Sequence, residues 1–376
     1  MTEKIRVLHL LTGLTSGGVQ NVVLNYADAI QPHGVVFDYV VQKDGNSALE
    51  KKCIEAGSRI YRLPEMQKKP LSFFLQLIRI LRQHPEYRIF HAHQNDLNTF
   101  SLLAAKLAAV PVRISHSHSC RPNSSWKKLL KIINHGLLRA ISTEQWACSK
   151  AAFQWLYDRQ FEDRHHEYIL HNAINGSKFQ HDSQRRRQLR EQMGLNGNFV
   201  CMCVATLSYN KNQKFLIDVM SYLHHEVKAT HIKLVLVGDG TIKSQLEQYA
   251  SEKGVCEHIV FLGDRSDVHE LLNAADCFVL PSMFEGLSVS VIEAQANDLP
   301  CILSHGVPQE NRIKTDVFFE SIGEDAVFCW ANRILELRDK TEKQRERTDW
   351  ILRESGFLLN EEAEKLSARY KELFSK

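Results

Sequence analysis

Residues 277–295 read CFVLPSMFEGLSVSVIEAQ, and this stretch decides the fold. Its first four residues are all apolar, which is typical of a strand buried on both faces in a parallel sheet. Pro281 ends the strand, a turn containing Gly286 follows, and a helix is expected from about Ser288. The first N–H groups of such a helix have no partner within it, so they form a site for anions. The stretch therefore predicts a strand, an anion-binding turn and a helix.

Two acidic residues, Glu285 and Glu293, lie on either side of this joint. Glu285 falls in the loop beside the expected anion site, and Glu293 falls on the helix about a turn and a half further on. Glu285 is placed to accept hydroxyl groups on one side of the phosphates, and Glu293 is placed to accept hydroxyl groups on the other side. The pattern favours a nucleotide diphosphate sugar, with its phosphates at Gly286, Leu287 and Ser288.

Strand-like and helix-like runs alternate along both halves of the chain. The runs expected as strands are 5–11, 35–42, 59–64, 88–93 and 112–117 in the first half, and 199–206, 233–239, 258–263, 277–282 and 300–304 in the second. Such alternation predicts a parallel sheet with helices on both faces. The expected fold is therefore α/β, with two doubly wound Rossmann-like domains. A polar, charge-rich stretch separates them, and we place the boundary near residue 175.

The ordered motifs of the chain resemble the retaining glycosyltransferases of family 4, and the bacterial capsular and exopolysaccharide branch in particular. The segments that carry the resemblance are GLTSGGVQNVVLNY (13–26), FHAHQND (90–96), RISHSHS (113–119), ACSKAAFQWL (147–156), ILHNAIN (169–175), YNKNQKFLIDV (209–219), LVLVGDGT (234–241), IVFLGDRSDV (259–268) and PSMFEGLSVSVIEAQANDLPCILS (281–304). The resemblance implies the GT-B fold, in which two domains face each other across a cleft. It implies an acceptor-binding domain over 1–175, a donor-binding domain over 176–357, and a C-terminal helix at about 358–376 that crosses back to the first domain.

A glycine pair, Gly17 and Gly18, follows the first expected strand and precedes a helix. Glycine lets the backbone approach a ligand closely, and the N–H groups there can bind phosphate. A plain tight turn is the alternative interpretation. The resembling family uses this loop on the diphosphate and the acceptor, so the resemblance favours ligand contact.

Four histidines end two expected strands of the first half: His91, His93, His116 and His118. The two-residue period of a strand puts each pair on one face. By the resemblance, His116 faces the transferred sugar, with His118 as the alternative. His91 and His93 are either acceptor contacts or hydrogen-bonded residues that line the cleft. Four imidazoles could also gather around zinc, but no thiolate or carboxylate joins them at the spacing of a metal site. The resembling architecture handles its leaving group without a metal, so we expect no metal and no other cofactor.

The second half offers a cation for the donor phosphates. Lys211 aligns with the family's phosphate-binding lysine, at the carboxyl end of the first strand of the second sheet, where doubly wound folds bind ligands. The family pattern has Gly-Arg where this chain has Ala205-Thr206. A hydroxyl group cannot replace the planar bidentate clamp of arginine. Thr206 therefore marks a departure from the family inside the expected donor site.

Two further strand ends of the second half carry Gly238-Asp239 and Gly263-Asp264-Arg265. The resembling family places its nucleotide base near the second of these, which makes Gly238, Asp264 and Arg265 donor-binding candidates. The two aspartates could instead be turn or cap residues, which is a common role for aspartate at such positions.

The charge is unevenly distributed. Residues 1–176 contain 22 basic and 14 acidic residues, whereas the rest contain 25 basic and 30 acidic residues. No helix-turn-helix, zinc-ligand or RNP pattern accompanies the basic half, so we expect no nucleic-acid partner. A membrane surface or an anionic lipid-linked substrate fits better. The helical stretches 71–84 and 126–141 are both basic and apolar, which is typical of core packing or of docking on an anionic membrane.

The sequence thus predicts a hexosyltransferase in which His116, Glu285 and Lys211 serve the transfer. The donor is a nucleotide diphosphate sugar, expected to be a UDP-sugar, and the acceptor is a saccharide or a lipid-linked saccharide. Retention comes from the resemblance, since no carboxylate is poised as a nucleophile. Because no apolar run reaches the roughly 18 residues of a membrane span and the N-terminus shows no export signal, we expect the chain in the cytoplasm, at the inner face of the membrane. A sugar-nucleotide 2-epimerase and a catalytically silent donor-binding subunit are the alternatives.

Overall fold

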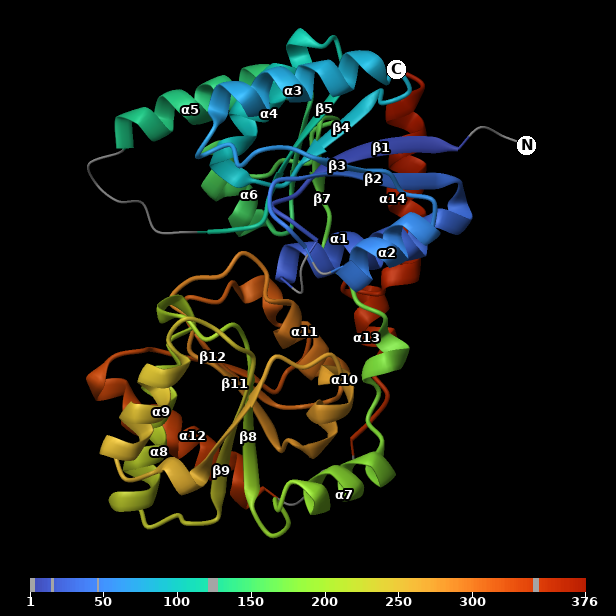
Figure 1. Ribbon diagram of the computed structural model, residues 1–376. Coiled ribbons are helices and arrows are strands. Elements are labelled where there is room, and N and C mark those ends of the chain that lie inside the picture. The colour runs from blue at the N-terminus through green and yellow to red at the C-terminus, as the bar shows by residue number, and fades with distance from the viewer. Residues whose placement is uncertain (1–3, 15–16, 46, 121–127, 341–344) are drawn as a thin grey trace. The chain divides into compact units, whose positions relative to one another are not determined.

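The computed structural model describes the chain except for residues 1–3, 15–16, 46, 121–127 and 341–344. The chain forms two compact units (Figure 1). Unit 1 contains Met1–Ile174 and Gly356–Lys376, and unit 2 contains Asn175–Ser355. Each unit is built around its own parallel sheet. The doubly wound α/β prediction is confirmed for both halves of the chain.

Unit 1 has a seven-stranded sheet in the order β3-β2-β1-β4-β5-β6-β7. Its strands are β1 (Ile5–Leu10), β2 (Val35–Val41), β3 (Ile60–Arg62), β4 (Ile89–Ala92), β5 (Val112–Ser117), β6 (Glu144–Ala147) and β7 (Glu167–Ile169). The connecting helices are α1 (Gly18–Ile30), α2 (Ser47–Glu55), α3 (Pro70–Gln83), α4 (Asn98–Leu107), α5 (Lys128–Ile141) and α6 (Lys150–Tyr157). The chain runs outward from β1 to β3, then returns to the other side of β1 and continues to β7. The direction of the strand order therefore reverses between β1 and β4.

Unit 2 repeats this plan with a six-stranded sheet in the order β10-β9-β8-β11-β12-β13. Its strands are β8 (Phe199–Val204), β9 (Ile232–Val237), β10 (Ile259–Gly263), β11 (Cys277–Leu280), β12 (Cys301–Ser304) and β13 (Val317–Glu320). Its helices are α7 (Ser183–Gln192), α8 (Gln213–His225), α9 (Lys243–Glu252), α10 (Val268–Leu271), α11 (Val289–Ala296), α12 (Val327–Asp339) and α13 (Asp349–Glu354). All four residues of β11 are buried, as expected for a central strand. The reversal here lies between β8 and β11.

Three short strands, β6, β7 and β13, were absent from the sequence prediction. Two of them begin with a glutamate, Glu144 in β6 and Glu167 in β7, and both side chains are buried. A buried acid breaks the apolar pattern that identifies a strand in a sequence. Each acid has a cationic partner: Arg159 pairs with Glu167, and Arg369 pairs with Glu144. The partners lie outside the strands, so the strands themselves give no signal.

The last helix, α14 (Leu359–Phe374), packs on unit 1 beside α1 (Figure 1). Its apolar face, which contains Ala363, Leu366, Tyr370 and Leu373 at helical spacing, is buried. Two polar contacts fix it further. The Tyr370 hydroxyl lies 2.7 Å from His91 Nδ1, and the Arg369 guanidinium donates to Glu144 Oε2 at 2.7 Å. Both contacts reach strands of the sheet, so α14 is an integral part of unit 1.

We expect Arg369→Ala to destabilise unit 1 by about 3–5 kcal/mol, because it leaves the buried Glu144 carboxylate without its cation. The side chains of Arg369 and Glu144 are only 11% and 5% exposed. Urea unfolding measures the change. The matched control is Arg347→Ala, since Arg347 is 82% exposed and pairs with Asp349 on the surface. Equal free energies of unfolding for the two variants would contradict this account of the helix.

Candidate active site

The strand order of unit 2 reverses between β8 and β11, and the loops that follow these two strands meet there. In a doubly wound sheet the loops on either side of this point diverge and leave a crevice for ligands. The loop after β8 contains Thr206 and Lys211, and the loop after β11 contains Glu285 and Gly286. The structure therefore brings the predicted donor-site residues of two distant segments to one edge of the sheet.

An ion pair joins the two loops. Lys211 Nζ lies 2.5 Å from Glu285 Oε1, and the two side chains are 22% and 11% exposed. Backbone contacts support the pair, because Met283 N donates to the Asn210 carbonyl at 2.8 Å and Asn210 Nδ2 donates to the Phe284 carbonyl at 3.1 Å. The lysine and the glutamate predicted from the sequence are thus direct partners in the structure. This contact was not predicted from the sequence.

Helix α11 begins at the predicted place. Ser288 is the N-cap residue, and Val289 is the first residue of the helix. Asn311 holds this turn: its Nδ2 donates to the Ser288 carbonyl at 3.0 Å, and its Oδ1 accepts from Ser288 N at 3.3 Å. Gly286 and Leu287 are buried within the turn. Asn311, which was not predicted from the sequence, therefore stabilises the turn between β11 and α11.

Glu293 lies in the second turn of α11, and burial raises its pKa to about 7. A carboxyl group in an apolar setting resists ionisation, since the charged form loses its hydration. A carboxyl group that titrates near neutral pH is a frequent feature of functional sites. Of the two predicted acidic residues, Glu293 is therefore the one whose pKa is raised by burial.

The glycines of this edge have a packing role. A Cβ atom on Gly238 would lie 2.2 Å from the Ala205 carbonyl oxygen, and one on Gly240 would lie 2.1 Å from the Leu207 carbonyl oxygen. Gly238 also has a φ of 133°, which side chains rarely tolerate. Close contact with the loop after β8 therefore requires glycine at position 238, and contact of Gly238 with the donor stays a prediction.

The remaining predicted donor residues lie at the surface. Thr206 is exposed, two residues after the end of β8. Asp264 and Arg265 are exposed after β10, and the Arg265 guanidinium binds both carboxylate oxygens of Asp267, at 2.7 and 2.5 Å. Asp267, and not Asp264, is the N-cap residue of the following helix. Asp239 accepts a hydrogen bond from Gly240 N, which is the turn role considered for it.

Unit 1 gathers its predicted residues at its own reversal point, between β1 and β4. Gly17 caps α1, and Gly18 is the first residue of that helix. The four predicted histidines lie on one face of β4 and β5, and a fifth, His9 of β1, joins them. His9 was not predicted from the sequence as part of this group. The available signal was its position near the carboxyl end of the first strand, where it pairs in register with His91.

Hydrogen bonds link the five imidazoles in two chains. His9 Nδ1 lies 2.9 Å from His93 Nε2, and His93 Nδ1 lies 2.8 Å from His118 Nε2. In the second chain, His91 Nε2 lies 3.0 Å from His116 Nδ1, and His91 Nδ1 lies 2.7 Å from the Tyr370 hydroxyl. The hydrogen-bonding alternative considered for His91 and His93 is therefore present.

Burial keeps these rings neutral. Desolvation lowers the pKa of His9 and of His118 to about 3, and it lowers the pKa values of His91, His93 and His116 well below the usual value. His116 is only 1% exposed, whereas His118 is partly exposed. Of the two candidates for sugar contact, His118 is the one at the surface, with His116 stacked behind it at 4.0 Å between ring centroids.

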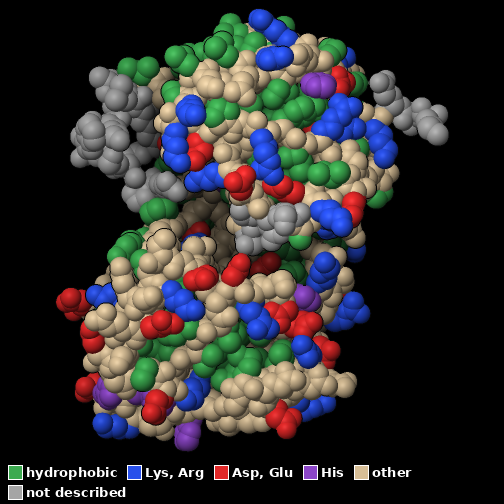
Figure 2. All heavy atoms as spheres, viewed as in Figure 1, with side chains coloured by type: hydrophobic (Ala, Val, Ile, Leu, Met, Phe, Trp, Pro, Cys, Tyr) green, Lys and Arg blue, Asp and Glu red, His purple; other side chains and the backbone are tan. Residues whose placement is uncertain are grey.

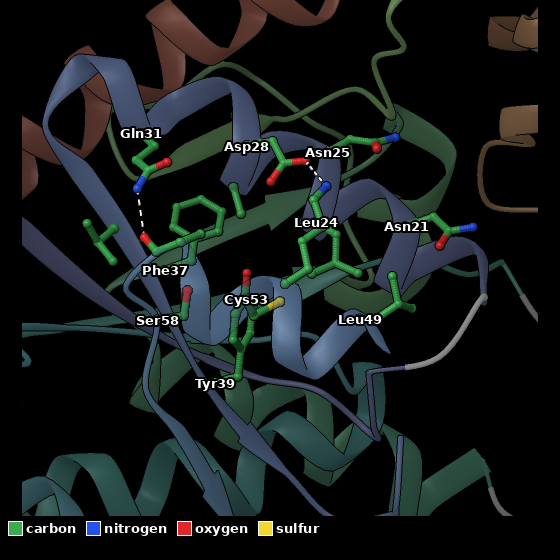
Figure 3. A pocket seen from close by; sticks show the side chains of 14 residues that line it. Asn21, Leu24, Asn25, Asp28, Gln31, Phe37, Tyr39, Leu49, Cys53 and Ser58 are labelled. Atoms are coloured by element: carbon green, nitrogen blue, oxygen red, sulfur yellow. Dashed lines mark hydrogen bonds and ion pairs between the residues drawn. The ribbon is translucent and has the colours of Figure 1, made fainter. Parts of the chain in front are cut away.

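A separate pocket of unit 1 lies between α1 and α2, over β2 (Figure 3). Its empty volume is ≈ 660 Å³. Polar groups at its rim bond to neighbouring groups: Lys52 Nζ donates to Asp28 Oδ2 at 2.5 Å, and Gln31 Nε2 donates to the Ala56 carbonyl at 2.7 Å. The sides of two helices form this pocket, not the carboxyl ends of strands. We therefore do not include it in the candidate active site.

Two family models match the chain. The model described as "Glycosyltransferase Family 4" matches residues 16–175, and the model described as "Glycosyl transferases group 1" matches residues 185–323. Together they cover most of both units.

Curated relatives match along most of their length. The protein of Bacillus subtilis (strain 168) named "Putative glycosyltransferase EpsF" is 30% identical over 314 residues, which are 81% of this chain and 80% of EpsF. The UDP-Gal:alpha-D-GlcNAc-diphosphoundecaprenol alpha-1,3-galactosyltransferase of Escherichia coli is 24% identical over the same shares. The capsular polysaccharide biosynthesis glycosyltransferase CapH of Staphylococcus aureus is 23% identical over 89% of this chain and 90% of CapH.

Solved structures share the fold. HepE of Anabaena, in complex with UDP and glucose, matches with a TM-score of 0.74 and 17% identity over 97% of this chain and 95% of HepE. A glycosyltransferase of Rickettsia africae matches with a TM-score of 0.77 and 16% identity over 99% of both chains. At such low identity these two likenesses concern the fold.

The raised pKa of Glu293 leads to a prediction that can be tested without a ligand. Its pKa of about 7 lies above the 4.5 of a free glutamate, so the folded state holds this proton more tightly than the unfolded chain does. The free energy of unfolding should therefore fall as pH rises from about 4.5 to 7, by up to about 3 kcal/mol from this group. Glu293→Gln should remove that fall.

Urea unfolding at pH 5 and pH 8 measures the effect. The matched control is Glu247→Gln on α9, since the Glu247 side chain is 47% exposed. If Glu293→Gln and Glu247→Gln show the same pH dependence as the unmodified chain, the carboxyl group of Glu293 is not desolvated.

Proposed function

The chain belongs to glycosyltransferase family 4, and from that premise we propose that it moves a hexose from a UDP-sugar to a saccharide or lipid-linked saccharide, with retention and without a metal at the reacting groups. Unit 2 binds the donor in this proposal, and unit 1 binds the acceptor. The observation that carries the proposal is the ion pair between Lys211 and Glu285 at the point where the strand order of unit 2 reverses. A cation, an acid and a helix N-terminus there are what a sugar diphosphate requires.

The relatives support the choice of donor. The galactosyltransferase of Escherichia coli is named for UDP-Gal and for an acceptor carried on diphosphoundecaprenol. The HepE structure contains UDP and glucose. CapH is named for capsular polysaccharide biosynthesis. These names favour a uridine nucleotide and a glycan that grows on a lipid carrier.

In this proposal, binding of the diphosphate at Lys211 makes the Glu285 carboxylate available to the sugar. The diphosphate competes with Glu285 for the lysine, because both are anions and Lys211 has one ammonium group. When the phosphates take Lys211, the Glu285 carboxylate is released and accepts a sugar hydroxyl. Glu293 accepts the ribose hydroxyls from its place one turn further along α11. A nucleotide without a sugar would leave Glu285 unpaired, so the complete donor is preferred.

The transfer occurs on one face of the sugar. The bond between the anomeric carbon and the phosphate oxygen breaks, a bond from the acceptor oxygen to the same carbon forms, and the acceptor proton passes to the leaving phosphate. Lys211 and the N–H groups at the start of α11 stabilise the negative charge on that phosphate. Gly17 and Gly18, at the start of α1 in unit 1, are further candidates for contact with phosphate. His118, the partly exposed imidazole, contacts the sugar with His116 behind it.

We expect Glu293→Gln to weaken UDP binding by about tenfold or more, because one charged hydrogen bond is worth about 1.5–3 kcal/mol. Glu285→Gln should lower turnover with a UDP-sugar more than it weakens UDP binding, since its role begins when the sugar is present. Calorimetry with UDP and initial transfer rates measure the two effects, with Glu247→Gln as the control. Unchanged UDP affinity in Glu293→Gln would refute its assignment to the ribose.

The same assays separate the alternatives. A 2-epimerase converts the donor without any acceptor, so epimerised UDP-sugar in the absence of acceptor would replace the proposed function. A silent donor-binding subunit binds UDP-sugars but transfers nothing to any acceptor in a screen of saccharides and lipid-linked saccharides.

Unit 1 also carries a surface suited to an anionic membrane at the inner face of the cell membrane. Hydrophobic side chains are exposed on two helices that both contact α4, with Leu71 and Leu75 on α3 and Ile132, Ile133 and Leu137 on α5. Exposed basic residues accompany them, and Figure 2 shows hydrophobic and basic side chains interspersed over this unit. Such a surface suits docking at a lipid headgroup layer. Among the described residues, no helix combines the length and apolar character of a membrane span.

Other residues of these two helices follow the core-packing alternative. Phe73, Leu77 and Leu81 of α3 are buried, as is Ile141 of α5, so they belong to the core. Trp126 and Lys127 lie outside the described residues.

Membrane docking predicts that the chain sediments with vesicles of anionic phosphatidylglycerol and not with neutral phosphatidylcholine. The double change Ile133→Glu and Leu137→Glu should abolish sedimentation without loss of stability, since both side chains are about half exposed. Ile54→Glu on α2 is the control, because Ile54 is equally exposed. Sedimentation that survives the double change, or that ignores lipid charge, would count against this surface.

A further inference from the structure

A pocket of unit 1 outside the candidate active site has the dimensions of a binding site for a small molecule. It lies between α1 and α2, over β2, and part of its empty volume of ≈ 660 Å³ is open to solvent (Figure 3). Pockets that bind small molecules usually have volumes of about 300–1,000 Å³. All residues that line it belong to unit 1, so the pocket is formed within one compact unit.

The hydroxyl group of Tyr39 lacks a hydrogen-bond partner among the residues that the structure describes. Tyr39 of β2 is fully buried, and it lines the pocket. The Cys53 thiol of α2 lies close to this hydroxyl group, but a thiol is only a weak donor and acceptor. A buried hydroxyl group has lost its water, so it needs a hydrogen bond within the molecule or to a ligand.

The other fully buried tyrosines of unit 1 show the usual arrangement. Each of these four hydroxyl groups lies 2.6–2.8 Å from a partner: Tyr26 from the His171 carbonyl, Tyr87 from Asp38, Tyr157 from the Ser115 carbonyl, and Tyr370 from His91. Tyr39 is therefore an exception in its own unit, and the space beside its hydroxyl group is the pocket.

The charges around the pocket suit an uncharged ligand. Lys52 and Asp28 are the charged side chains among the described residues that line it, and they form an ion pair with each other at 2.5 Å. Burial raises the pKa values of Tyr39 and Cys53, so the hydroxyl group and the thiol both stay protonated. The lining thus has no excess charge that an ionic ligand would compensate.

We propose that this pocket binds a neutral molecule with one aromatic ring and one hydroxyl group, which is a simple phenol. The ring packs against apolar side chains from all three elements, Leu24 of α1, Phe37 of β2 and Leu49 of α2. The hydroxyl group of the ligand forms a hydrogen bond with the Tyr39 hydroxyl group, which satisfies the buried atom.

A saccharide suits this pocket less well. Its hydroxyl groups point in all directions around the ring, and each needs a polar partner when it is buried. Asp28, Lys52 and Gln31 at the rim are already bonded to neighbouring groups. The wall behind them offers the hydroxyl groups of Tyr39 and Ser58. The site is therefore distinct from the saccharide sites of the proposed function and does not depend on them.

Fluorine NMR of the full-length chain tests the site with two probes that differ by one hydroxyl group, 4-fluorophenol and fluorobenzene. We expect 4-fluorophenol to bind saturably, with a dissociation constant in the millimolar range or below, because a ligand of this size makes few contacts. Fluorobenzene should bind about threefold to tenfold more weakly, since it lacks the hydrogen bond to Tyr39. Neither a UDP-sugar nor an acceptor is present, so the result does not depend on transfer activity.

Two variants separate the hydrogen bond from the space. Tyr39→Phe keeps the ring and removes a hydroxyl group without a partner in the described part of the chain, so it should stay folded and bind both probes equally. Ala27→Leu adds a larger side chain to the part of the pocket formed by α1, so it should bind neither probe. Ala140→Leu on α5 is the matched control, because Ala140 is exposed and lies outside the pocket. It should bind both probes as the unmodified chain does.

Three results would overturn the site. The first is the absence of saturable 4-fluorophenol binding to the unmodified chain. The second is an unchanged preference for 4-fluorophenol over fluorobenzene in Tyr39→Phe, because the hydroxyl group of the ligand would then have another partner. The third is unchanged affinity in Ala27→Leu, because the probe would then bind outside this pocket.

Discussion

The reversal of strand order in each parallel sheet is the constraint on which the candidate site depends. Because strands on either side of the reversal continue into helices on opposite faces, the loops that leave them diverge and their backbone groups stay open to a ligand. In unit 2 this places the loop after β8 beside the loop after β11, where Lys211 meets Glu285. Residues separated by 74 positions become partners for this reason alone.

The buried carboxylates Asp38, Glu144 and Glu167 of unit 1 have hydrogen-bond or ionic partners. Asp38 of β2 is fully buried, and it accepts hydrogen bonds from the Arg6 guanidinium, Arg59 N and the Tyr87 hydroxyl. The buried glutamates of β6 and β7 each pair with an arginine. Three ring nitrogens of the histidine cluster, by contrast, have no hydrogen-bond partner among the described residues: His9 Nε2, His116 Nε2 and His118 Nδ1.

The sequence predicted the fold class and the strand-turn-helix joint around Glu285 because both depend on local signals. Apolar runs, proline and glycine act within a few residues, and they placed β11 and α11 correctly. The strands β6 and β7 were missed because their buried acids depend on Arg369 and Arg159, which lie outside those strands. His9 was missed for the same kind of reason: a single histidine in an apolar strand gains its meaning only from the imidazoles of the neighbouring strands. Partners that are distant in the sequence produce no pattern in the residues next to the buried group.

The replacement of the family's arginine by Thr206 is best understood through the surroundings that the structure shows. Thr206 is exposed at the end of β8, so the position left by a guanidinium is open to solvent and leaves no buried gap to fill. The Lys211 side chain is 22% exposed and paired with Glu285, so its ammonium group is positioned before any ligand arrives. A positioned cation in a site of low dielectric attracts phosphate more strongly than an exposed one does. On the proposed function, the chain therefore depends on one preorganised lysine where the family pattern uses two cations, and Glu285 determines when that lysine becomes available.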